Sequence, residues 1–406
     1  MAVNLAPPAE LRSVAGVQLG ATGARIKHAD RDDLLVIALD PGAATAGVFT
    51  QSAFRAAPVQ ICEVHLRAGE IRALVINSGN ANAATGDPGH DDALSICAAV
   101  ARALGCRKEQ VLPFSTGVIG VRLPVEQICD ALSAAIAGLT PDGWMRAAHA
   151  IMTTDTVAKA RSRQFTLAGI QCTATGMCKG AGMLKPDMAT MLAYVATDAA
   201  IDGALLQRLT RWLADRSFNR VTIDGDTSTN DSFIVVATGK AGAALIQSET
   251  DPNYVVLRDN LLALSAELAQ SIARDGEGAT RFVTIDVIGA RDDEEAGRVA
   301  FTIAESPLIK TAMFAGDPNW GRFCMAIGRA GIADLDTRGV SLFLDDVCVA
   351  RGGMLSTEYS EAEGVRVMAQ SEYHVQVDLS RGHGKDRVWT CDFSYDYVKI
   401  NAEYRT

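Results

Sequence analysis

The chain lacks the long apolar run that a membrane-spanning helix requires. Nearly half of its 406 residues are apolar and the mean hydropathy is +0.11, yet no stretch approaches the roughly 18 uninterrupted apolar residues of such a helix. Residues 1–16 also lack the basic and apolar segments of a secretory signal, so we expect a cytoplasmic protein with no membrane partner. At this length a single core stops growing, which predicts two lobes.

Cysteine and histidine occur without the spacings typical of metal or redox chemistry. The nine cysteines form no C-x-x-C pair, and the six histidines stand singly along the chain. We interpret the cysteines as reduced, mostly buried apolar residues, and each histidine as an ordinary structural residue. The sequence therefore predicts no metal site and no catalytic histidine.

Positive charge is also in deficit. The 38 basic and 48 acidic residues give a formal net charge of −10, which disfavours nonspecific binding to nucleic acid or to an anionic membrane surface. The chain lacks the lysine spacing of a P-loop, so the polar run GDTSTND (225–231) is interpreted as an ordered turn. Local basic groups can still bind a small anion.

Short apolar runs alternate with helical patterns in the first half, which predicts a mixed α/β fold. Strands are expected over residues 34–40, 71–77 and 111–114. Apolar positions at helical spacing indicate a helix over residues 91–104, with Gly105 as its C-terminal cap. A second helix is expected to begin at Pro124 and to end near residue 139.

The second half repeats this mixture. Leucine-rich helical faces are expected over residues 205–213 and 256–272. Alternation of apolar and polar residues indicates half-buried strands over 283–287 and 375–379. The second of these strands is expected to pair with residues 387–393 across a glycine-bearing turn. Layered helices and mixed sheets follow from these patterns.

One segment, KGAGMLKPDMATML at residues 179–192, joins a broken loop to the start of a strand. Two glycines and a proline within seven residues exclude a helix, and the proline also excludes a central strand. The apolar run at 191–195 then fits a buried strand. The hydroxyl of Thr190 is thereby placed between an irregular loop and a rigid element, a suitable position for a nucleophile.

A threonine in this position could cleave its own chain. If the turn twists the preceding peptide out of planarity, Thr190 can attack the carbonyl of Ala189 and form an ester, which water hydrolyses. Thr190 would then be a new N-terminus, whose α-amine has a reference pKa of about 7.7 to 8.0 and could act as the base for its own hydroxyl. From these residues alone, an ordinary strand threonine is the simpler interpretation.

Seven separated segments, in order, resemble the ornithine acetyltransferase family, the self-processing glutamate N-acetyltransferases of the arginine pathway. They are INSGNANAATG (76–86), STGVIG (115–120), MTTDT (152–156), KGAGMLKPDMATML (179–192), SFNRVTIDGDTSTNDS (217–232), AMFAGDPNWGR (312–322) and YDYVKINAEYRT (395–406). The resemblance covers essentially the whole chain. It implies a layered α/β sandwich of mixed sheets and helices in two lobes, cleaved into an α chain (1–189) and a β chain (190–406).

The resemblance implies a ping-pong acetyltransferase. Thr190 would take the acetyl group from N2-acetylornithine, release ornithine and pass the acetyl group to glutamate, with no metal or cofactor. Some members of the family also accept acetyl-CoA as a co-substrate, and the sequence leaves this choice open. The family also implies that two α and two β chains form a heterotetramer.

Four residues are predicted for catalysis and substrate binding from their chemistry together with the resemblance. A turn after a strand could aim the Thr116 hydroxyl and the Gly117 N–H at one oxyanion; alone, STG would be an ordinary turn. Lys179 is the candidate cation for a substrate carboxylate, and Glu277 is the candidate acid for the ornithine ammonium.

Three further substrate contacts are implied by the resemblance alone. Thr153 in MTTDT is one, although the neighbouring hydroxyl of Thr154 is an alternative. Asn401 and Thr406 are the others, and they require the end of the chain to be docked.

Two other functions remain open from the residues alone. A self-processing aminopeptidase or amidohydrolase would pass its acyl group to water rather than to an amine. A non-enzymatic ligand-binding protein would leave the turn before Thr190 uncleaved.

Overall fold

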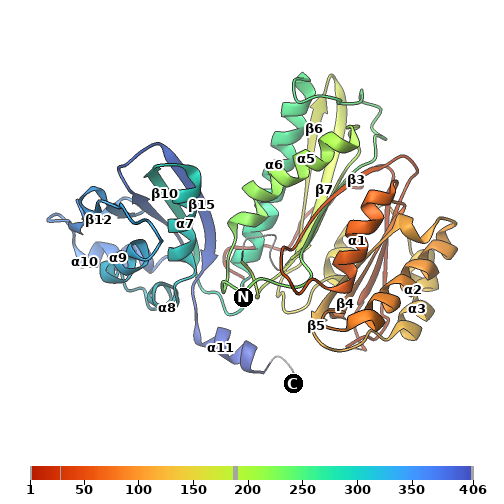
Figure 1. Cartoon of the computed structure of the whole chain (residues 1–406), viewed down its shortest axis with the longest axis horizontal. Helices are drawn as coiled ribbons and strands as arrows, with labels where there is room; N and C mark the ends of the chain where they lie inside the picture. Colours follow the sequence, from red (N-terminus) through yellow and green to blue (C-terminus); the bar gives the residue numbers. More distant parts are fainter. Residues whose placement is uncertain (1, 28, 186–190, 404–406) are drawn as a thin grey trace.

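The computed structural model describes residues 2–27, 29–185 and 191–403 and shows a chain folded into two lobes (Figure 1). The larger lobe contains two sheets with helices packed outside them, and the smaller lobe contains a third sheet with its own helices. The predicted α/β fold of layered helices and mixed sheets in two lobes is confirmed. The smaller lobe begins near Arg281, well after residue 190.

The first sheet of the larger lobe is built from the N-terminal part of the chain. In spatial order its strands are β1 (Val17–Thr22), β2 (Leu34–Leu39), β4 (Ala73–Asn80) and β5 (Val111–Val118). Two helices, α2 (Gly86–Leu104) and α3 (Val125–Ala137), pack on its outer face through a shared apolar cluster. The shorter helices of this region are α1 (Ala57–Ala68) and α4 (Trp144–Ala150).

The second sheet combines strands from both sides of residue 190. In spatial order they are β3 (Ala44–Phe49), β9 (Ser232–Ala237), β8 (Leu192–Thr197), β7 (Ile170–Lys179) and β6 (Lys159–Leu167). Helices α5 (Gly203–Arg216) and α6 (Pro252–Arg274) cover its outer face. Strands β7 and β8 are antiparallel neighbours, and Lys179 pairs with Leu192 at the end where the connecting segment leaves the sheet.

The two sheets pack against each other and enclose a core between them. Phe114 of β5 meets Tyr194 of β8 edge to face, with ring centroids 5.2 Å apart. Other side chains of this cluster come from both sheets, including Ile37 and Ile76 from the first and Met177 and Ile234 from the second. The larger lobe is thus a four-layer sandwich in which two sheets lie between two helical layers.

The smaller lobe is organised around one six-stranded sheet. In spatial order its strands are β13 (Met354–Leu355), β12 (Val347–Arg351), β11 (Ser341–Leu344), β14 (Glu372–Asp378), β10 (Phe282–Ala290) and β15 (Gly384–Cys391). Its helices are α7 (Asp293–Ala304), α8 (Pro307–Ala315), α9 (Trp320–Gly328) and α10 (Glu361–Met368). A last helix, α11 (Tyr395–Ala402), leaves this lobe and lies below the junction of the two lobes (Figure 1).

The predicted pairing of residues 375–379 with 387–393 is wrong. Strand β10 lies between β14 and β15, parallel to the first and antiparallel to the second. Val283 and Ile285 of β10 are completely buried. A buried strand needs hydrogen-bond partners for its backbone on both sides, and a central position in the sheet provides them. The glycine-bearing connection therefore crosses an intervening strand rather than closing a hairpin.

Most of the predicted element positions agree with the structure. The helix expected over 91–104 begins five residues earlier, at Gly86, and ends at Leu104 as predicted. Gly105 adopts a left-handed conformation (φ 67°) and donates its N–H to the carbonyl of Ala101, so the predicted cap is confirmed.

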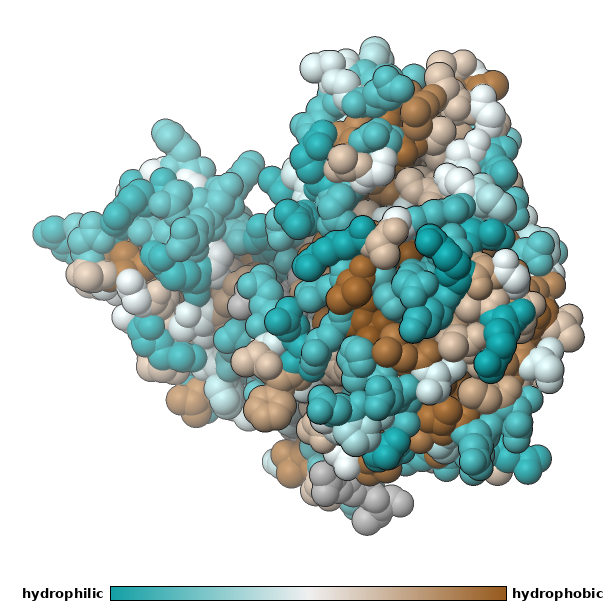
Figure 2. Space-filling view, turned by 45° about the vertical axis from the view of Figure 1, so that its right-hand side comes forward, coloured by the Kyte–Doolittle hydropathy of each residue, from teal (hydrophilic) through white to brown (hydrophobic). Residues whose placement is uncertain are grey.

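Figure 2 shows the notch between the lobes and the largely polar surface that the smaller lobe presents in this view. No helix in the parts of the chain that the structure describes has the length and apolar character needed to cross a membrane. All nine cysteines are free thiols, five of them buried, as predicted.

Candidate functional site

Six of the predicted site residues line one cavity of about 270 Å³, here called the first cavity. They are Thr116, Gly117, Thr153, Lys179, Glu277 and Asn401. They come from β5, the loop after α4, the end of β7, the turn after α6, and α11. Segments up to 285 residues apart in the sequence (116 to 401) therefore meet at this site.

The remaining predicted site residues, Ala189, Thr190 and Thr406, lie outside the described residues. The chain is described again from Met191, whose N–H donates to Oδ1 of Asp231 at 2.9 Å. Strand β8 begins at the next residue, in agreement with the buried strand predicted after the broken loop.

Thr116 and Gly117 lie within strand β5, so the prediction that STG forms a turn is wrong. Parallel pairing with β4 continues through this segment and places Gly117 opposite Gly79. Gly117 has a φ of 134°, and a Cβ at this position would lie 2.2 Å from the carbonyl carbon of Gly79 and 2.5 Å from the nitrogen of Asn80. Only glycine can occupy this position, because both the backbone conformation and the close approach of β4 exclude a side chain.

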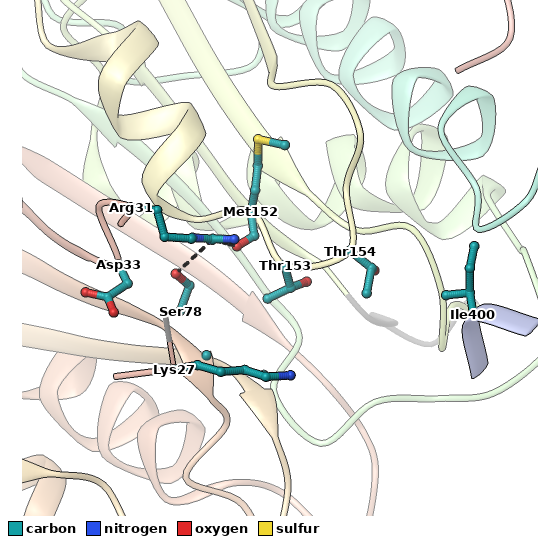
Figure 3. A pocket seen from close by; sticks show the side chains of 10 residues that line it. Lys27, Arg31, Asp33, Ser78, Met152, Thr153, Thr154 and Ile400 are labelled. Atoms are coloured by element: carbon teal, nitrogen blue, oxygen red, sulfur yellow. Dashed lines mark hydrogen bonds between the residues drawn. The ribbon is translucent and has the colours of Figure 1, made fainter. Parts of the chain in front are cut away.

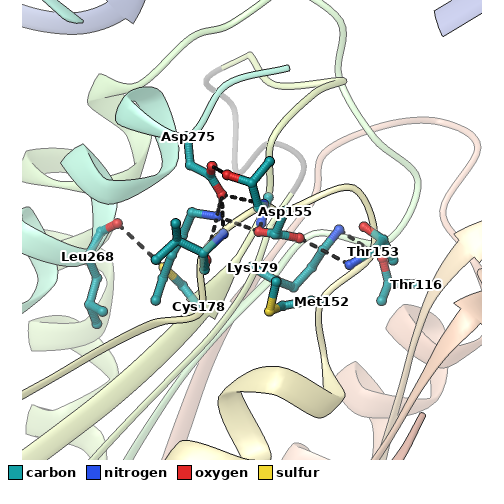
Figure 4. A network of polar contacts seen from close by, with 12 residues as sticks. Thr116, Met152, Thr153, Asp155, Cys178, Lys179, Leu268 and Asp275 are labelled. Atoms are coloured by element: carbon teal, nitrogen blue, oxygen red, sulfur yellow. Dashed lines mark hydrogen bonds and ion pairs between the residues drawn. The ribbon is translucent and has the colours of Figure 1, made fainter. Parts of the chain in front are cut away.

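Lys179 is a buried cation with a direct contact to Thr116. Its side chain ends at the cavity, and its Nζ donates to Oγ1 of Thr116 at 3.0 Å (Figure 4). An ammonium can only donate, so the threonine oxygen is the acceptor and its hydroxyl hydrogen is available to another group. Burial lowers the pKa of Lys179, although the nearby carboxylate of Asp155 opposes this shift.

A buried triad of charges lies behind Lys179 (Figure 4). Nζ of Lys159 is 2.6 Å from Oδ1 of Asp155 and 2.6 Å from Oδ2 of Asp275, and all three side chains are almost completely buried. Burial alone would raise the pKa of Asp155, but the charges of Lys159 and Lys179 lower it below its ordinary value. Burial would likewise lower the pKa of Lys159, but the two carboxylates raise it. Asp155 and Lys159 therefore both stay ionised.

Asp155 also fixes the backbone on two sides of the cavity. Its Oδ2 accepts the N–H of Thr153 at 3.1 Å, and its Oδ1 accepts the N–H of Gly180 at 2.8 Å. The loop that carries the two candidate hydroxyls is thus held against the residue that follows Lys179. Both Thr153 and Thr154 line the cavity, so both interpretations of the MTTDT motif stand.

Glu277 also lines the first cavity, and it is joined to α11. Its N–H donates to the carbonyl of Ala181 at 2.7 Å, and its Oε2 accepts from Nδ2 of Asn401 at 2.8 Å. Gly182 leaves room for this carboxylate, because a Cβ there would lie 2.6 to 3.0 Å from its atoms. Gly182 and Asn401 therefore determine where the acid points.

Helix α11 is docked at its start as well as at Asn401. Oγ of Ser394 donates to the carbonyl of Gly278 at 2.6 Å and caps the helix. The ring of Tyr397 stacks on Phe393 with a centroid distance of 4.4 Å, as expected for an aromatic anchor. Tyr395 is 83% exposed, and its ring meets Phe314 edge to face with a centroid distance of 5.5 Å.

Sequence reasoning missed two parts of this region. Ser228, Thr229 and Asn230 also line the first cavity, within the run interpreted only as an ordered polar turn. Nδ2 of Asn230 donates to the carbonyls of Ala81 and Ser115, which holds that turn against β5. The other is a second cavity that shares Gly117, Thr153 and Thr154 with the first. Within the described residues, no group of three or more His, Cys, Asp or Glu side chains is arranged to hold a metal ion.

Comparison with known proteins shows the family to which this chain belongs. The model of the ArgJ family matches residues 18–406. The arginine biosynthesis bifunctional protein ArgJ of Bacillus halodurans is 38% identical and has a TM-score of 0.51; the match covers 52% of this chain and 99% of that chain. The ornithine acetyltransferase of Mycobacterium tuberculosis, solved with ornithine, is 35% identical, with coverages of 43% and 95% and a TM-score of 0.38. This chain belongs to the ArgJ family, whose enzymes are acetyltransferases of arginine biosynthesis.

Proposed function

We propose that this chain transfers the acetyl group of N2-acetylornithine to glutamate through an acetyl ester on Thr190. The observation that carries the proposal is the meeting of Thr116, Gly117, Lys179 and Glu277 at one cavity. These residues supply donors for an oxyanion and charges of both signs for an acetylated diamino acid. Strand β8 begins two residues after Thr190 and borders β7, which ends at Lys179.

The chain cleaves itself between Ala189 and Thr190 in this proposal. Cleavage divides the 406 residues into chains of 189 and 217 residues. The Bacillus halodurans chain is matched over 99% of its length yet accounts for 52% of this chain, so it is about half as long, which supports a division near the middle. The new N-terminus supplies the α-amine that acts as the base.

In the first half-reaction, the Thr190 hydroxyl loses its proton to its own α-amine and attacks the acetyl carbonyl. The Thr116 hydroxyl donates to the resulting oxyanion because its oxygen already accepts from Lys179, and the Gly117 N–H is the second donor. One such donor contributes about 2.7 to 4 kcal/mol in other enzymes. The intermediate collapses, the amine returns the proton to the leaving nitrogen, and ornithine departs from acetyl-Thr190.

Charge selects the donor substrate. Glu277 is positioned to pair with the side-chain ammonium of acetylornithine, with Asn401 holding its carboxylate in place. Lys179 has three N–H donors, so it can keep Thr116 and still contact the substrate α-carboxylate. Thr153 or Thr154 and, at the chain end, Thr406 complete the proposed contacts.

In the second half-reaction, the amine of glutamate attacks the acetyl ester and gives up a proton to the α-amine of Thr190. The ester C–O bond breaks, the α-amine returns the proton to the Thr190 oxygen, and N-acetylglutamate leaves. No metal or resident cofactor takes part in this proposal, and acetyl-CoA is a candidate alternative donor to Thr190. The cleaved chains work as a heterotetramer of two α and two β chains in the cytoplasm.

Purified protein tests the cleavage on a denaturing gel with N-terminal sequencing. We expect two bands, one of which begins at Thr190. The Thr190→Ala variant should remain uncut and inactive, whereas Thr250→Ala, at an exposed threonine outside the cavity, should be cut normally. A single intact band from the parent chain would remove both the cleavage and the nucleophile.

The same preparation tests the transfer. With N2-acetylornithine and glutamate we expect equal amounts of ornithine and N-acetylglutamate. Without glutamate, ornithine release should stop after about one equivalent of enzyme, as an acyl-enzyme requires. Continuous release of ornithine and acetate without glutamate would instead identify an amidohydrolase.

A further inference from the structure

A second cavity of about 220 Å³ adjoins the first cavity. It shares Gly117, Thr153 and Thr154 with the first cavity, so the two meet beside the proposed oxyanion site. Consecutive residues of α11 divide them: Ile400 lines the second cavity and Asn401 lines the first. A substrate whose reacting group lies beside Gly117 could therefore extend its side chain into either cavity.

The second cavity is lined by Arg31 and Lys27, whereas the first is lined by Lys179 and Glu277. Arg31 and Lys27 lie on one side of it and Ile400 on the other (Figure 3). The guanidinium of Arg31 donates to Oγ of Ser78 at 3.3 Å and to the carbonyl of Met152, both neutral acceptors. Within the described ranges, no ion pair joins Arg31 to a carboxylate.

One carboxylate, that of Asp33, also lines the second cavity. Its two oxygens accept the N–H groups of Ala24 and Ile26, each at 2.6 Å. These backbone donors already stabilise its charge. The Arg31 guanidinium, which contacts only neutral acceptors in the part of the chain that the structure describes, therefore makes the cavity suited to an anionic group.

We propose that the second cavity binds the side-chain carboxylate of the acceptor glutamate, whereas the first cavity binds the side-chain ammonium of ornithine. This inference rests on the proposed function, because it concerns the two substrates of the same ester. Both substrates are α-amino acids that present the same nitrogen to the same acetyl carbon, but their side chains carry opposite charges. A glutamate side chain in the first cavity would face Glu277, and two carboxylates at close range repel.

Separate cavities resolve this conflict without movement of the catalytic residues. The shared wall of Gly117, Thr153 and Thr154 keeps the reacting atoms in one place. Arg31, with a planar guanidinium, is the residue best suited to receive a carboxylate, and Lys27 adds a second positive charge.

The test uses the cleaved enzyme with Arg31→Gln and, separately, Lys27→Gln. We expect Arg31→Gln to raise the KM for glutamate by about tenfold or more, the usual effect of losing a charged hydrogen bond, and Lys27→Gln to act in the same direction. The KM for N2-acetylornithine should stay within about twofold of the parent value. Arg25→Gln, which removes a cation from the same loop outside both cavities, is the matched control and should change neither KM.

Glutamine as acceptor distinguishes a direct contact from a structural effect. It lacks the side-chain charge, so the preference for glutamate over glutamine in kcat/KM should fall by about tenfold in Arg31→Gln if the guanidinium meets that charge. A preference that is unchanged in both variants, or an equal loss for glutamate and N2-acetylornithine, would overturn the proposal. A parent enzyme that makes no N-acetylglutamate would overturn the proposed function, and this inference with it.

Discussion

At the scale of single residues, the side chain of Lys179 is buried and contacts a small set of fixed partners instead of water. Its ammonium donates to Thr116, and the charge of Asp155 partly offsets the cost of burial. A hydroxyl that accepts from an ammonium is a better donor to a developing oxyanion than one solvated by water. In the proposed mechanism, Lys179 therefore acts on the reacting atoms through Thr116 as well as through the substrate carboxylate.

Replacing this cation tests the arrangement. Lys179→Met should lower kcat by about 100-fold or more, because the oxyanion loses a polarised donor. Steady-state kinetics, together with thermal unfolding to confirm the fold, measures the effect. Lys185→Met, which removes a partly exposed lysine paired with Glu305 at 3.3 Å, should leave kcat nearly unchanged. Equal losses in both variants would contradict the role of Lys179.

The pH profile of the same variant checks the charge. Burial lowers the pKa of Lys179, so the folded protein should lose this proton at a pH below the reference value of about 10.4. The charged form is needed, and kcat/KM should therefore fall on the alkaline side as the proton leaves. Lys179→Met should lack this alkaline fall. A fall that persists unchanged in the variant would assign it to another group.

Gly182 offers a test of Glu277 that leaves its carboxylate in the chain. An added methyl group would lie 2.6 to 3.0 Å from the carboxylate, so Gly182→Ala should displace Glu277. We expect the KM for N2-acetylornithine to rise by about tenfold with a smaller effect on glutamate, measured in both half-reactions. Gly203→Ala is the matched control, since a methyl group there meets nothing within 4 Å. Unchanged kinetics in Gly182→Ala would exclude Glu277 from substrate binding.

At the scale of elements, the buried triad joins three parts of the larger lobe. Lys159 begins β6, Asp275 is the C-terminal cap of α6, and Asp155 reaches Gly180 just beyond β7. Asp275 also accepts the N–H of Thr156 at 2.9 Å. The ends of two strands and a helix are therefore held at the first cavity by opposite charges in a dry environment.

Removing the central cation should destabilise the whole lobe. Lys159→Met leaves two buried carboxylates without their ammonium, a change that typically costs about 3 to 5 kcal/mol. Urea unfolding at neutral pH measures this loss. Lys240→Met removes an exposed lysine 3.8 Å from Asp40, and it should cost less than about 1 kcal/mol. Similar losses of unfolding free energy in the two variants would show that the buried triad stabilises the protein no more than an exposed ion pair does.

The sign of the pH effect provides a second check on the triad. The pKa of Asp155 is lowered in the folded state, so its contribution to stability is present above the unfolded pKa and is lost as pH falls through the folded value. In Lys159→Met the carboxylate of Asp155 loses the support of Lys159 and protonates more readily. The destabilisation should therefore shrink as the pH is lowered from 7 toward 4. A stability loss in Lys159→Met that grows as the pH is lowered would contradict this account.

At the scale of the whole molecule, the proposed cleavage divides the sequence but not the folding units. Strands β3, β6 and β7 come from residues before 190, and β8 and β9 come from residues after it, yet all five form one sheet. Leu192 to Thr197 pairs with β7 on one side and β9 on the other. The core between the two sheets likewise takes side chains from residues before and after 190.

The two fragments should accordingly remain together after cleavage. Size-exclusion chromatography without denaturant should give one peak that contains both chains, and only a denaturing gel should separate them. The Thr190→Ala precursor provides the uncut reference and should elute at the same position. Spontaneous separation of the fragments in native buffer would contradict the shared sheet.

Much of the local structure could be predicted from the sequence because it depends on neighbouring residues. Alternating apolar residues indicated β10, and the glycine cap at Gly105 was correct. The predicted partner of β14 was wrong, because the apolar pattern of a strand shows which of its faces is buried and not which strand lies beside it. Thr116 and Gly117 were assigned to a turn because STG is locally turn-like, whereas pairing with β4 extends the strand through them.

The candidate site, too, was predicted from the sequence in part. The sequence by itself, through chemistry and family motifs, determined which side chains could serve as nucleophile, oxyanion donor and charged partners. Only the tertiary structure decided that Lys179 meets Thr116, that Asn401 meets Glu277, and that Arg31 lies in an adjoining cavity. Residue type and local conformation are properties of short segments. Contacts across hundreds of residues arise only when the sheets pack and α11 docks, because burial and charge then select one arrangement of the whole chain.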